Sequence, residues 1–200
     1  AMWEERFATP DYLFGTAPAQ FLLDHAHLLT PDAMALAVAD GEGRNSVFMA
    51  GKGMRVTALE YAPSAIEKAR ALARERGVDV DFREIDVMAH DWRDEFDLVA
   101  GIFIQFVGPD DRAALFEGMK RSVKPGGLVL LHGYTPRQVD YGTGGPPYPE
   151  NMYTEAMLAQ AFAGWEILEN HAYERVIEEG TGHSGHSALI DFVARRPADE

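Results

Sequence analysis

The feature that most constrains the fold is the stretch of residues 35–60. It holds an apolar run, a glycine-rich turn, a short helical segment and a second apolar run. The turn contains Gly41 and Gly43, and the second run ends on Glu60, 19 residues after Gly41. Strand, turn, helix and strand in this order predict a βαβ unit, whose two strands are parallel.

The turn in this unit is suited to binding a nucleotide-like ligand. Gly41 and Gly43 let the backbone turn sharply and approach a ligand closely. The following helix offers free N–H groups and the positive end of its dipole. Glu60, at the carboxyl end of the next strand, can accept hydrogen bonds from ribose hydroxyls. The simpler alternative is a tight turn beside a polar strand end, but the full order of features favours binding.

Later segments extend the same pattern to one α/β domain. Near-continuous apolar runs at residues 97–103 and 128–132 predict buried parallel strands, and residues 165–176 and 188–194 predict two long terminal strands. We therefore expect a doubly wound, Rossmann-like sheet, mostly parallel with a C-terminal antiparallel hairpin and helices on both faces. The domain is expected to cover residues 1–200, with residues 1–30 as an arm and helix packed over the site.

Three local expectations accompany this fold. Ser64 and Glu67 have the spacing of a capping box at a helix start. Residues 78–85 alternate as a strand does. Residues 134–151 are rich in proline and glycine and predict a long loop, which in a compact domain is usually functional or mobile.

Composition limits the partners. The net charge of −14, from 18 basic and 32 acidic residues, opposes binding to phosphate backbones, so we expect no nucleic acid partner. No apolar run is long enough to span a bilayer and no signal peptide opens the sequence, so we expect no membrane partner. There is no cysteine, hence no disulfide or thiolate nucleophile. We expect a cytoplasmic protein, as a monomer or a homodimer.

Several motifs in order resemble one known family. They are Gly-Glu-Gly-Arg-Asn-Ser at 41–46, Trp-Glu-Glu-Arg-Phe at 3–7, Lys-Pro-Gly-Gly at 124–127 and Trp-Glu-Ile-Leu at 165–168. The chain resembles the class I S-adenosylmethionine-dependent methyltransferases over about residues 33–134. Within them it is similar to the small-molecule branch that contains the tellurite-resistance methyltransferases.

The resemblance implies the cofactor S-adenosyl-L-methionine and a set of binding residues. These are Asp40, Gly41, Gly43, Asn45, Glu60, Tyr61, Asp86, Val87, Gly101 and Ile102. Two positions depart from the family pattern, because Ala37 replaces an aspartate and Ala39 replaces the first glycine of the turn. A methyl group at Ala39 could crowd the cofactor if φ there is positive.

The methyl acceptor is expected over the carboxyl ends of the fourth and fifth strands. We predict catalytic roles for His132 and Tyr134. The predicted substrate contacts are Phe103, Gln105, Arg137, Tyr141, Tyr153 and His183. His183 and His186 without further ligands make a poor metal site, so no metal is predicted.

Together these features predict methyl transfer from S-adenosylmethionine to a small-molecule acceptor, such as a thiol or a chalcogen oxyanion. Two alternatives stay open. A protein with Ala37 and Ala39 could bind the cofactor without turnover. A nicotinamide-dependent oxidoreductase could use the same βαβ unit, although residues 41–46 lack its third glycine.

Overall fold

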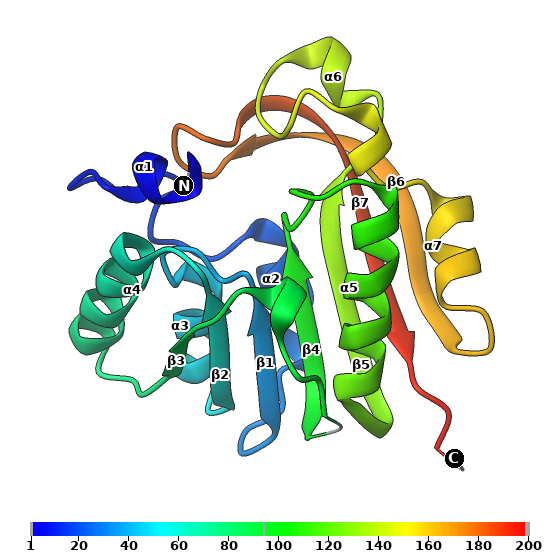
Figure 1. Cartoon of the computed structure of the whole chain (residues 1–200), viewed down its shortest axis with the longest axis horizontal. Coiled ribbons are helices and arrows are strands. Elements are labelled where there is room, and N and C mark those ends of the chain that lie inside the picture. The colour runs from blue at the N-terminus through cyan, green and yellow to red at the C-terminus, as the bar shows by residue number, and fades with distance from the viewer. Residues whose placement is uncertain (1, 94, 199–200) are drawn as a thin grey trace.

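A computed structural model describes residues 2–93 and 95–198; residues 1, 94, 199 and 200, which the single-domain prediction includes, lie outside it. In the described residues seven strands form one sheet in the order β3-β2-β1-β4-β5-β7-β6 (Figure 1). The strands are β1 (Met34–Val38), β2 (Arg55–Glu60), β3 (Asp81–Glu84), β4 (Phe96–Ile102), β5 (Val123–Tyr134), β6 (Glu166–Glu178) and β7 (Ser184–Arg195).

The strand directions confirm the predicted fold class. β3, β2, β1, β4 and β5 pair in parallel, whereas β7 runs antiparallel to both β5 and β6. Strands β1 and β4 are buried along nearly their whole length. Strands covered on both faces need apolar side chains at successive positions, which explains their continuous apolar runs.

Helices cover both faces of the sheet. One face packs against α2 (Gln20–Asp24) and α3 (Arg44–Gly51), and α3 packs in turn against α4 (Pro63–Arg76). The other face packs against α5 (Pro109–Ser122) and α7 (Glu155–Ala161). The remaining helical segments are α1 (Met2–Phe7), η1 (Ala26–Leu28), η2 (Val87–Ala89), α6 (Gln138–Tyr141) and η3 (Pro149–Asn151). None of the helices described for residues 2–93 and 95–198 has the length and apolarity to cross a membrane.

The long β6–β7 hairpin reaches across the carboxyl ends of the parallel strands to the N-terminal arm (Figure 1). Near the hairpin turn, the Gly182 amide donates to the Leu13 carbonyl at 3.1 Å. The Phe14 ring stacks on the His183 ring with centroids 4.3 Å apart. The first and last parts of the chain therefore meet over the sheet edge where a ligand is expected.

The predicted capping box at Ser64 is wrong. Helix α4 begins one residue earlier at Pro63, with Ala62 as its N-cap. Proline fits this first position because it has no N–H to leave unpaired. The carboxylate of Glu4 from α1 instead accepts hydrogen bonds from the Ser64 amide at 3.0 Å and the Ser64 hydroxyl at 2.5 Å. The helix start is thus capped by the N-terminal arm.

Other predicted bounds also shift. Strand β3 covers only Asp81–Glu84. Strand β5 includes the Lys-Pro-Gly-Gly motif at residues 124–127, and its register with β4 slips between Phe96 and Leu98. The stretch 134–151, predicted to be a long loop, contains α6 and η3. Short helices of this kind form from local bonds that hydrophobic periodicity does not reveal.

The turn at Gly43 gives a stability prediction. Gly43 has φ +91°, and a Cβ atom there would lie 2.7 Å from Cβ and 2.9 Å from Cα of Ala69 in α4. Gly77 is a matched control, because it also has positive φ (+67°) but its added Cβ would meet nothing within 4 Å. We expect Gly77→Ala to lower the free energy of unfolding by about 1–2 kcal/mol and Gly43→Ala by about 2–5 kcal/mol, since the clash adds to the backbone strain. Urea unfolding measures both, and equal losses would show that α4 shifts without cost.

Candidate cofactor and acceptor site

The carboxylate of Glu60 connects the turn after β1 with the start of α4. Its Oε1 accepts a hydrogen bond from the Gly41 amide at 2.8 Å. Its Oε2 accepts from the amides of Tyr61 and Ala62, each at 2.9 Å. Three backbone donors hold the carboxylate at the end of β2, so Glu60 is fixed in the place where the sequence predicts ribose recognition.

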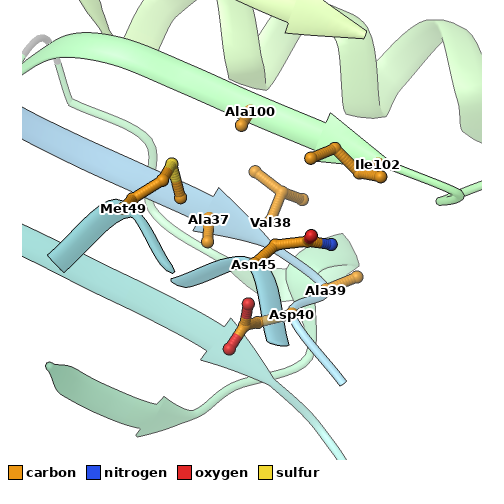
Figure 2. A pocket seen from close by; sticks show the side chains of 8 residues that line it. All are labelled: Ala37, Val38, Ala39, Asp40, Asn45, Met49, Ala100 and Ile102. Carbon is orange, nitrogen blue, oxygen red and sulfur yellow. The ribbon is translucent and has the colours of Figure 1, made fainter. Parts of the chain in front are cut away.

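The turn between β1 and α3 contains the predicted departure at Ala39. Ala39 has φ +50° and Gly41 has φ +66°, so the alanine adopts the left-handed conformation that glycine normally takes. A small cavity lies between this turn and β4 (Figure 2). It is lined by Ala37, Val38, Ala39, Asp40, Asn45, Met49, Ala100 and Ile102. The short side chains of the three alanines leave space beside this wall of the site.

Asp40 carries a half-buried carboxyl group beside Glu60. It accepts hydrogen bonds from the Ser46 amide at 3.2 Å and the Ser46 hydroxyl at 2.5 Å. Burial raises the pKa of Asp40 to about 7, and the charge of Glu60 adds to the shift, while the bonds from Ser46 oppose it. Asp40 therefore holds its proton over part of the near-neutral range.

Other predicted cofactor contacts follow the turn after β1 and the carboxyl ends of β2 and β3. Asn45 lines the cavity and its side-chain oxygen accepts from the Ala19 amide at 2.9 Å, which ties the turn to the N-terminal segment. Tyr61 follows Glu60 directly and is 61% exposed. Asp86 accepts from the Met88 amide at 2.9 Å at the start of η2, and Val87 is buried. The fixed carboxylate of Glu60, a glycine-rich turn whose backbone a ligand can approach and the small alanines of the cavity wall together fit S-adenosylmethionine.

An aromatic cluster forms the acceptor side of the site. The His183 ring lies between two phenyl rings, with centroids 4.3 Å from Phe14 and 4.0 Å from Phe103. Phe103 follows β4 directly and has φ +56°. The cluster joins the N-terminal arm, the end of β4 and the β6–β7 hairpin, so it closes over the carboxyl ends of the central strands.

Tyr134 and His183 form a buried hydrogen-bonded pair within this cluster. The Tyr134 hydroxyl is hydrogen-bonded to Nδ1 of His183. Burial and the neighbouring charges of Arg44 and His132 hold the pKa of His183 well below its usual range. Burial and the charge of Glu179 raise the pKa of Tyr134. At neutral pH the pair is therefore a neutral imidazole and a neutral phenol.

The other predicted catalytic residue, His132, lies beneath this cluster. Its ring makes an edge contact with Phe103 at 4.8 Å between centroids and stacks on Phe21 at 4.9 Å. Its Nδ1 donates to Oδ1 of Asp191 at 2.8 Å, and the side chain is 2% exposed. The geometry orients His132 towards the hairpin.

Some predicted substrate residues lie apart from the cluster. Arg137 and Tyr141 sit on the surface with Glu174, which lies 3.1 Å from the Arg137 guanidinium and accepts from the Tyr141 hydroxyl at 2.8 Å. Tyr153 packs in the core against Phe116 under α5. Gln105 is buried, and its amide brackets the backbone of Tyr134 through two bonds of 2.8 Å.

The sequence analysis missed a buried ion pair beside the cluster. Nη1 of Arg44 lies 2.7 Å from Oε1 of Glu179, and each side chain is 7% exposed. The Arg44 guanidinium lies 5.9 Å from the Phe14 ring centre and 6.0 Å from that of Phe103. Arg44 stands inside the glycine-rich motif at residues 41–46, and this position is a sequence signal for a role in the site. Glu179 has no comparable signal, because only the folded hairpin brings it there.

The carboxyl group of Asp40 gives a pH prediction. Its pKa is about 7 in the folded chain and near 3.8 when unperturbed. Between these values the folded chain binds more protons than the unfolded chain, so its stability falls as pH rises from about 4 to about 7. Asp40→Asn keeps an acceptor for Ser46 but has no carboxyl group to titrate. We therefore expect the fall in stability to shrink in this variant, by about 1.4 kcal/mol for each unit by which the pKa of Asp40 is raised in the folded chain. Denaturant unfolding at pH 5, 6, 7 and 8 tests this; parallel curves for both proteins would contradict it.

Glu60 gives a binding prediction. Replacing its carboxylate by an amide removes a charged acceptor, an interaction of about 1.5–3 kcal/mol. We expect Glu60→Gln to weaken S-adenosylmethionine binding by about 10- to 100-fold in calorimetric titration. Glu84→Gln is the matched control, because Glu84 is the exposed register partner of Glu60 on β3. Unchanged affinity in a folded Glu60→Gln protein would remove Glu60 from the site.

Comparison with known proteins finds similarity to methyltransferases. Residues 35–127 match the family model described as "Methyltransferase domain". A thiopurine S-methyltransferase of Pseudomonas putida is 28% identical over 219 residues, covering 98% of this chain and 97% of the relative.

Two solved structures share the fold. One, concerned with conversion of a disulfide bond into a thioacetal group during echinomycin biosynthesis, has a TM-score of 0.76, 22% identity, and coverage of 100% of this chain and 91% of that one. The N-methyltransferase NodS of Bradyrhizobium japonicum WM9, in complex with S-adenosyl-L-homocysteine, has a TM-score of 0.73, 14% identity, and coverage of 98% and 97%. These matches show a methyltransferase domain over residues 35–127, and the whole chain is similar in fold to solved methyltransferase structures.

Proposed function

We propose that this methyltransferase acts on a small molecule with a soft nucleophile, either a thiol or a chalcogen oxyanion. The observation that carries the proposal is the neutral His183 ring held between Phe14 and Phe103, with Arg44 beside both phenyl rings. This cluster stands next to the turn that we propose as the cofactor site. It offers apolar surface, one weak base and a buried guanidinium that shares its charge with Glu179.

The chemistry needs little from the protein beyond alignment. When bound, S-adenosylmethionine supplies a sulfonium-bound methyl group that a nucleophile displaces in line. A thiol acceptor forms a new S–C bond and loses its proton, and the bonding electrons of the broken C–S bond stay with the departing thioether. The rings of Phe14, His183 and Phe103 restrict the orientation of the acceptor and exclude water, so most of the rate gain comes from positioning.

The basicity of the site favours sulfur over oxygen. A free thiol has a pKa of about 8.5 and a phenol about 10, so a thiol loses its proton to a much weaker base. In the tautomer whose Nδ1–H donates to the Tyr134 hydroxyl, neutral His183 keeps a lone pair on Nε2 that can accept that proton, whereas the carboxylate of Glu179 is paired with Arg44. The Arg44 guanidinium has further N–H groups beside the one that pairs with Glu179, and these can donate to a thiolate or an oxyanion at the rings.

The relatives point to sulfur as well. The Pseudomonas putida relative is named an S-methyltransferase and matches almost the full length of both chains. The structure from echinomycin biosynthesis concerns conversion of a disulfide into a thioacetal. With the resemblance to tellurite-resistance methyltransferases, these names support a soft acceptor. NodS, which shares the fold at 14% identity, is an N-methyltransferase, so an amine is the competing acceptor. A cytoplasmic location and a monomer or homodimer stay predictions.

An acceptor comparison tests the proposal. Thiophenol, phenol and aniline present sulfur, oxygen and nitrogen on the same ring, and selenite and tellurite supply the oxyanions. With S-adenosylmethionine, we expect release of S-adenosylhomocysteine with thiophenol or an oxyanion at a rate at least tenfold above that with phenol or aniline. A preference for phenol or aniline would overturn the soft acceptor. Cofactor binding with no product from any acceptor would favour the alternative of binding without turnover.

The matched variants are His183→Gln and His186→Gln. His186 is exposed and pairs with Glu174 at 2.8 Å, outside the ring cluster. With benzyl mercaptan, an alkyl thiol that is protonated at neutral pH, we expect His183→Gln to lower kcat/KM by about 10²-fold, within the usual range for general bases, and His186→Gln to leave it unchanged. The loss of kcat/KM caused by His183→Gln should shrink as the pH approaches the thiol pKa, because the thiolate then forms without a base.

A further inference from the structure

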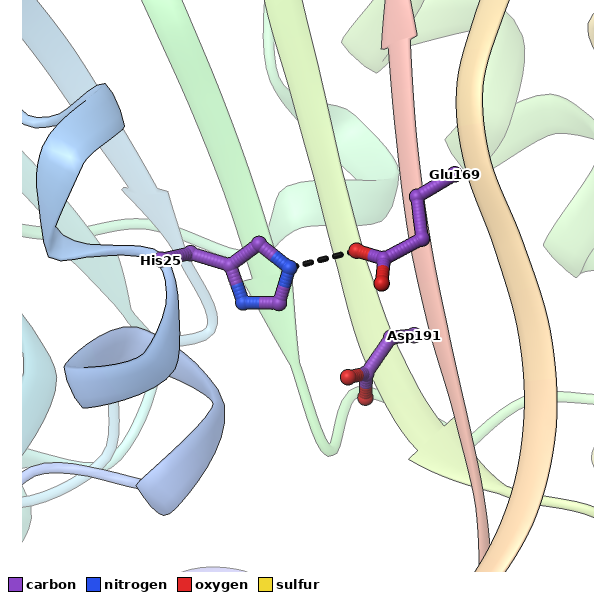
Figure 3. A group of neighbouring side chains, drawn as sticks. All are labelled: His25, Glu169 and Asp191. Atoms are coloured by element: carbon purple, nitrogen blue, oxygen red, sulfur yellow. Dashed lines mark hydrogen bonds and ion pairs between the residues drawn. The ribbon is translucent and has the colours of Figure 1, made fainter.

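A second polar cluster lies on the α2 face of the sheet. It joins His25, which ends α2, to Glu169 on β6 and Asp191 on β7 (Figure 3). One ligand atom from each residue lies within 4.8 Å of the other two. His25 and Asp191 are buried, whereas the Glu169 side chain is 36% exposed. The cluster therefore has a buried base and one side open to solvent.

The hydrogen bonds of His25 direct Nε2 to the carboxylates. Nδ1 lies 2.7 Å from the Phe21 carbonyl, which can only accept, so Nδ1 carries the proton. Nε2 lies 2.5 Å from Oε1 of Glu169. At this distance a proton lies between the two atoms, and the contact shows that the Nε2 lone pair and the carboxylate both face the same point. A metal ion could take the place of this proton only if the carboxylate moved back, because its bonds of about 2.0–2.2 Å need more room. Histidines that bind metals commonly donate their other N–H to a backbone carbonyl in this way.

Asp191 is oriented by two donors on one oxygen. Oδ1 accepts from Nδ1 of His132 at 2.8 Å and from the Tyr173 hydroxyl at 2.8 Å. We find no hydrogen bond to Oδ2 within the described part of the chain, so this oxygen is free to coordinate. Bonds that fix a carboxylate through its other oxygen are typical of the outer shell of a metal site.

We propose that His25, Glu169 and Asp191 bind a divalent transition-metal ion, with Zn²⁺ as the probe. One imidazole nitrogen and two carboxylate oxygens form a mixed donor set that suits ions such as Zn²⁺. Ligand bonds of about 2.0–2.2 Å place two donors on one ion at most about 4.4 Å apart. The present separations need a small contraction towards Asp191 and a retreat of the Glu169 oxygen from Nε2, and the exposure of Glu169 permits that motion.

Charge in the cluster favours a cation. Glu169 and Asp191 bring two negative charges to one buried imidazole. The Arg175 guanidinium, which lies 5.7 Å from the Tyr173 ring centre, is already paired with Asp24 at 3.1 Å. A divalent ion would neutralise both carboxylates without requiring a charged His25. The competing explanation is a proton shared between His25 and Glu169 as an ordinary ion pair.

A metal here would act as a cross-link. One ligand comes from the N-terminal helix segment and the other two from the strands of the terminal hairpin. His25 and Glu169 are 144 residues apart in the sequence. Asp191 also orients His132, whose ring contacts Phe103 in the acceptor cluster. The ion would therefore stabilise the join between the N-terminal segment and the hairpin, independently of which methyl acceptor is used.

Titration of the full chain with Zn²⁺ after chelator treatment tests the site. We expect one Zn²⁺ per chain by calorimetry and a rise in Tm that depends on Zn²⁺ concentration. His25→Gln and Glu169→Gln should each weaken binding at least tenfold and remove the Tm rise. Glu169→Gln leaves the buried groups in place, so it separates loss of a ligand from loss of folding. Co²⁺ should give visible d–d absorption in the parent protein and not in these variants.

The matched control is His186→Gln, which removes a second histidine–glutamate pair, His186 with Glu174, that lies within the hairpin and outside the proposed metal site. We expect it to bind Zn²⁺ as the parent does. No saturable Zn²⁺ binding by the parent would overturn the site in favour of the shared proton. Equal affinities for the parent and for a folded Glu169→Gln protein would also overturn it, since any metal would then lie elsewhere.

Discussion

The contact on which the site depends is the carboxylate of Glu60 accepting three backbone N–H groups. It fixes the turn after β1 through Gly41 and the start of α4 through Tyr61 and Ala62. Charge-assisted bonds to backbone amides are among the stronger hydrogen bonds, and these three converge where β1 and β2 end side by side. The cofactor side of the site is therefore organised by one acid and the two segments it holds.

The acceptor side is organised differently, by contacts between distant segments. The N-terminal arm, the end of β4 and the terminal hairpin each supply one ring of the Phe14–His183–Phe103 stack. The Arg44–Glu179 pair links the turn after β1 to the same hairpin. A buried ion pair is costly to break, because removing one partner leaves the other charged and desolvated. The hairpin is thus held close to both halves of the site.

The hairpin also connects the acceptor side with the proposed metal site. Asp191 lies opposite His132 in the register of β5 and β7, so the two side chains share one face of the sheet. His132 contacts Phe103 on one side and Asp191 on the other. His132 therefore connects the acceptor cluster, through Phe103, with the proposed metal site, through Asp191.

The sequence by itself determined the βαβ unit, the parallel core and the place of Glu60, because these follow from local periodicity and from short spacings. It did not determine the start of α4, where Glu4 replaced the expected cap, or the separation of Arg137, Tyr141 and Tyr153 from the acceptor rings. Those outcomes depend on contacts between residues far apart in the chain. Only the tertiary structure could place Glu179 on Arg44 and Glu169 on His25, since no sequence spacing encodes a meeting across more than a hundred residues.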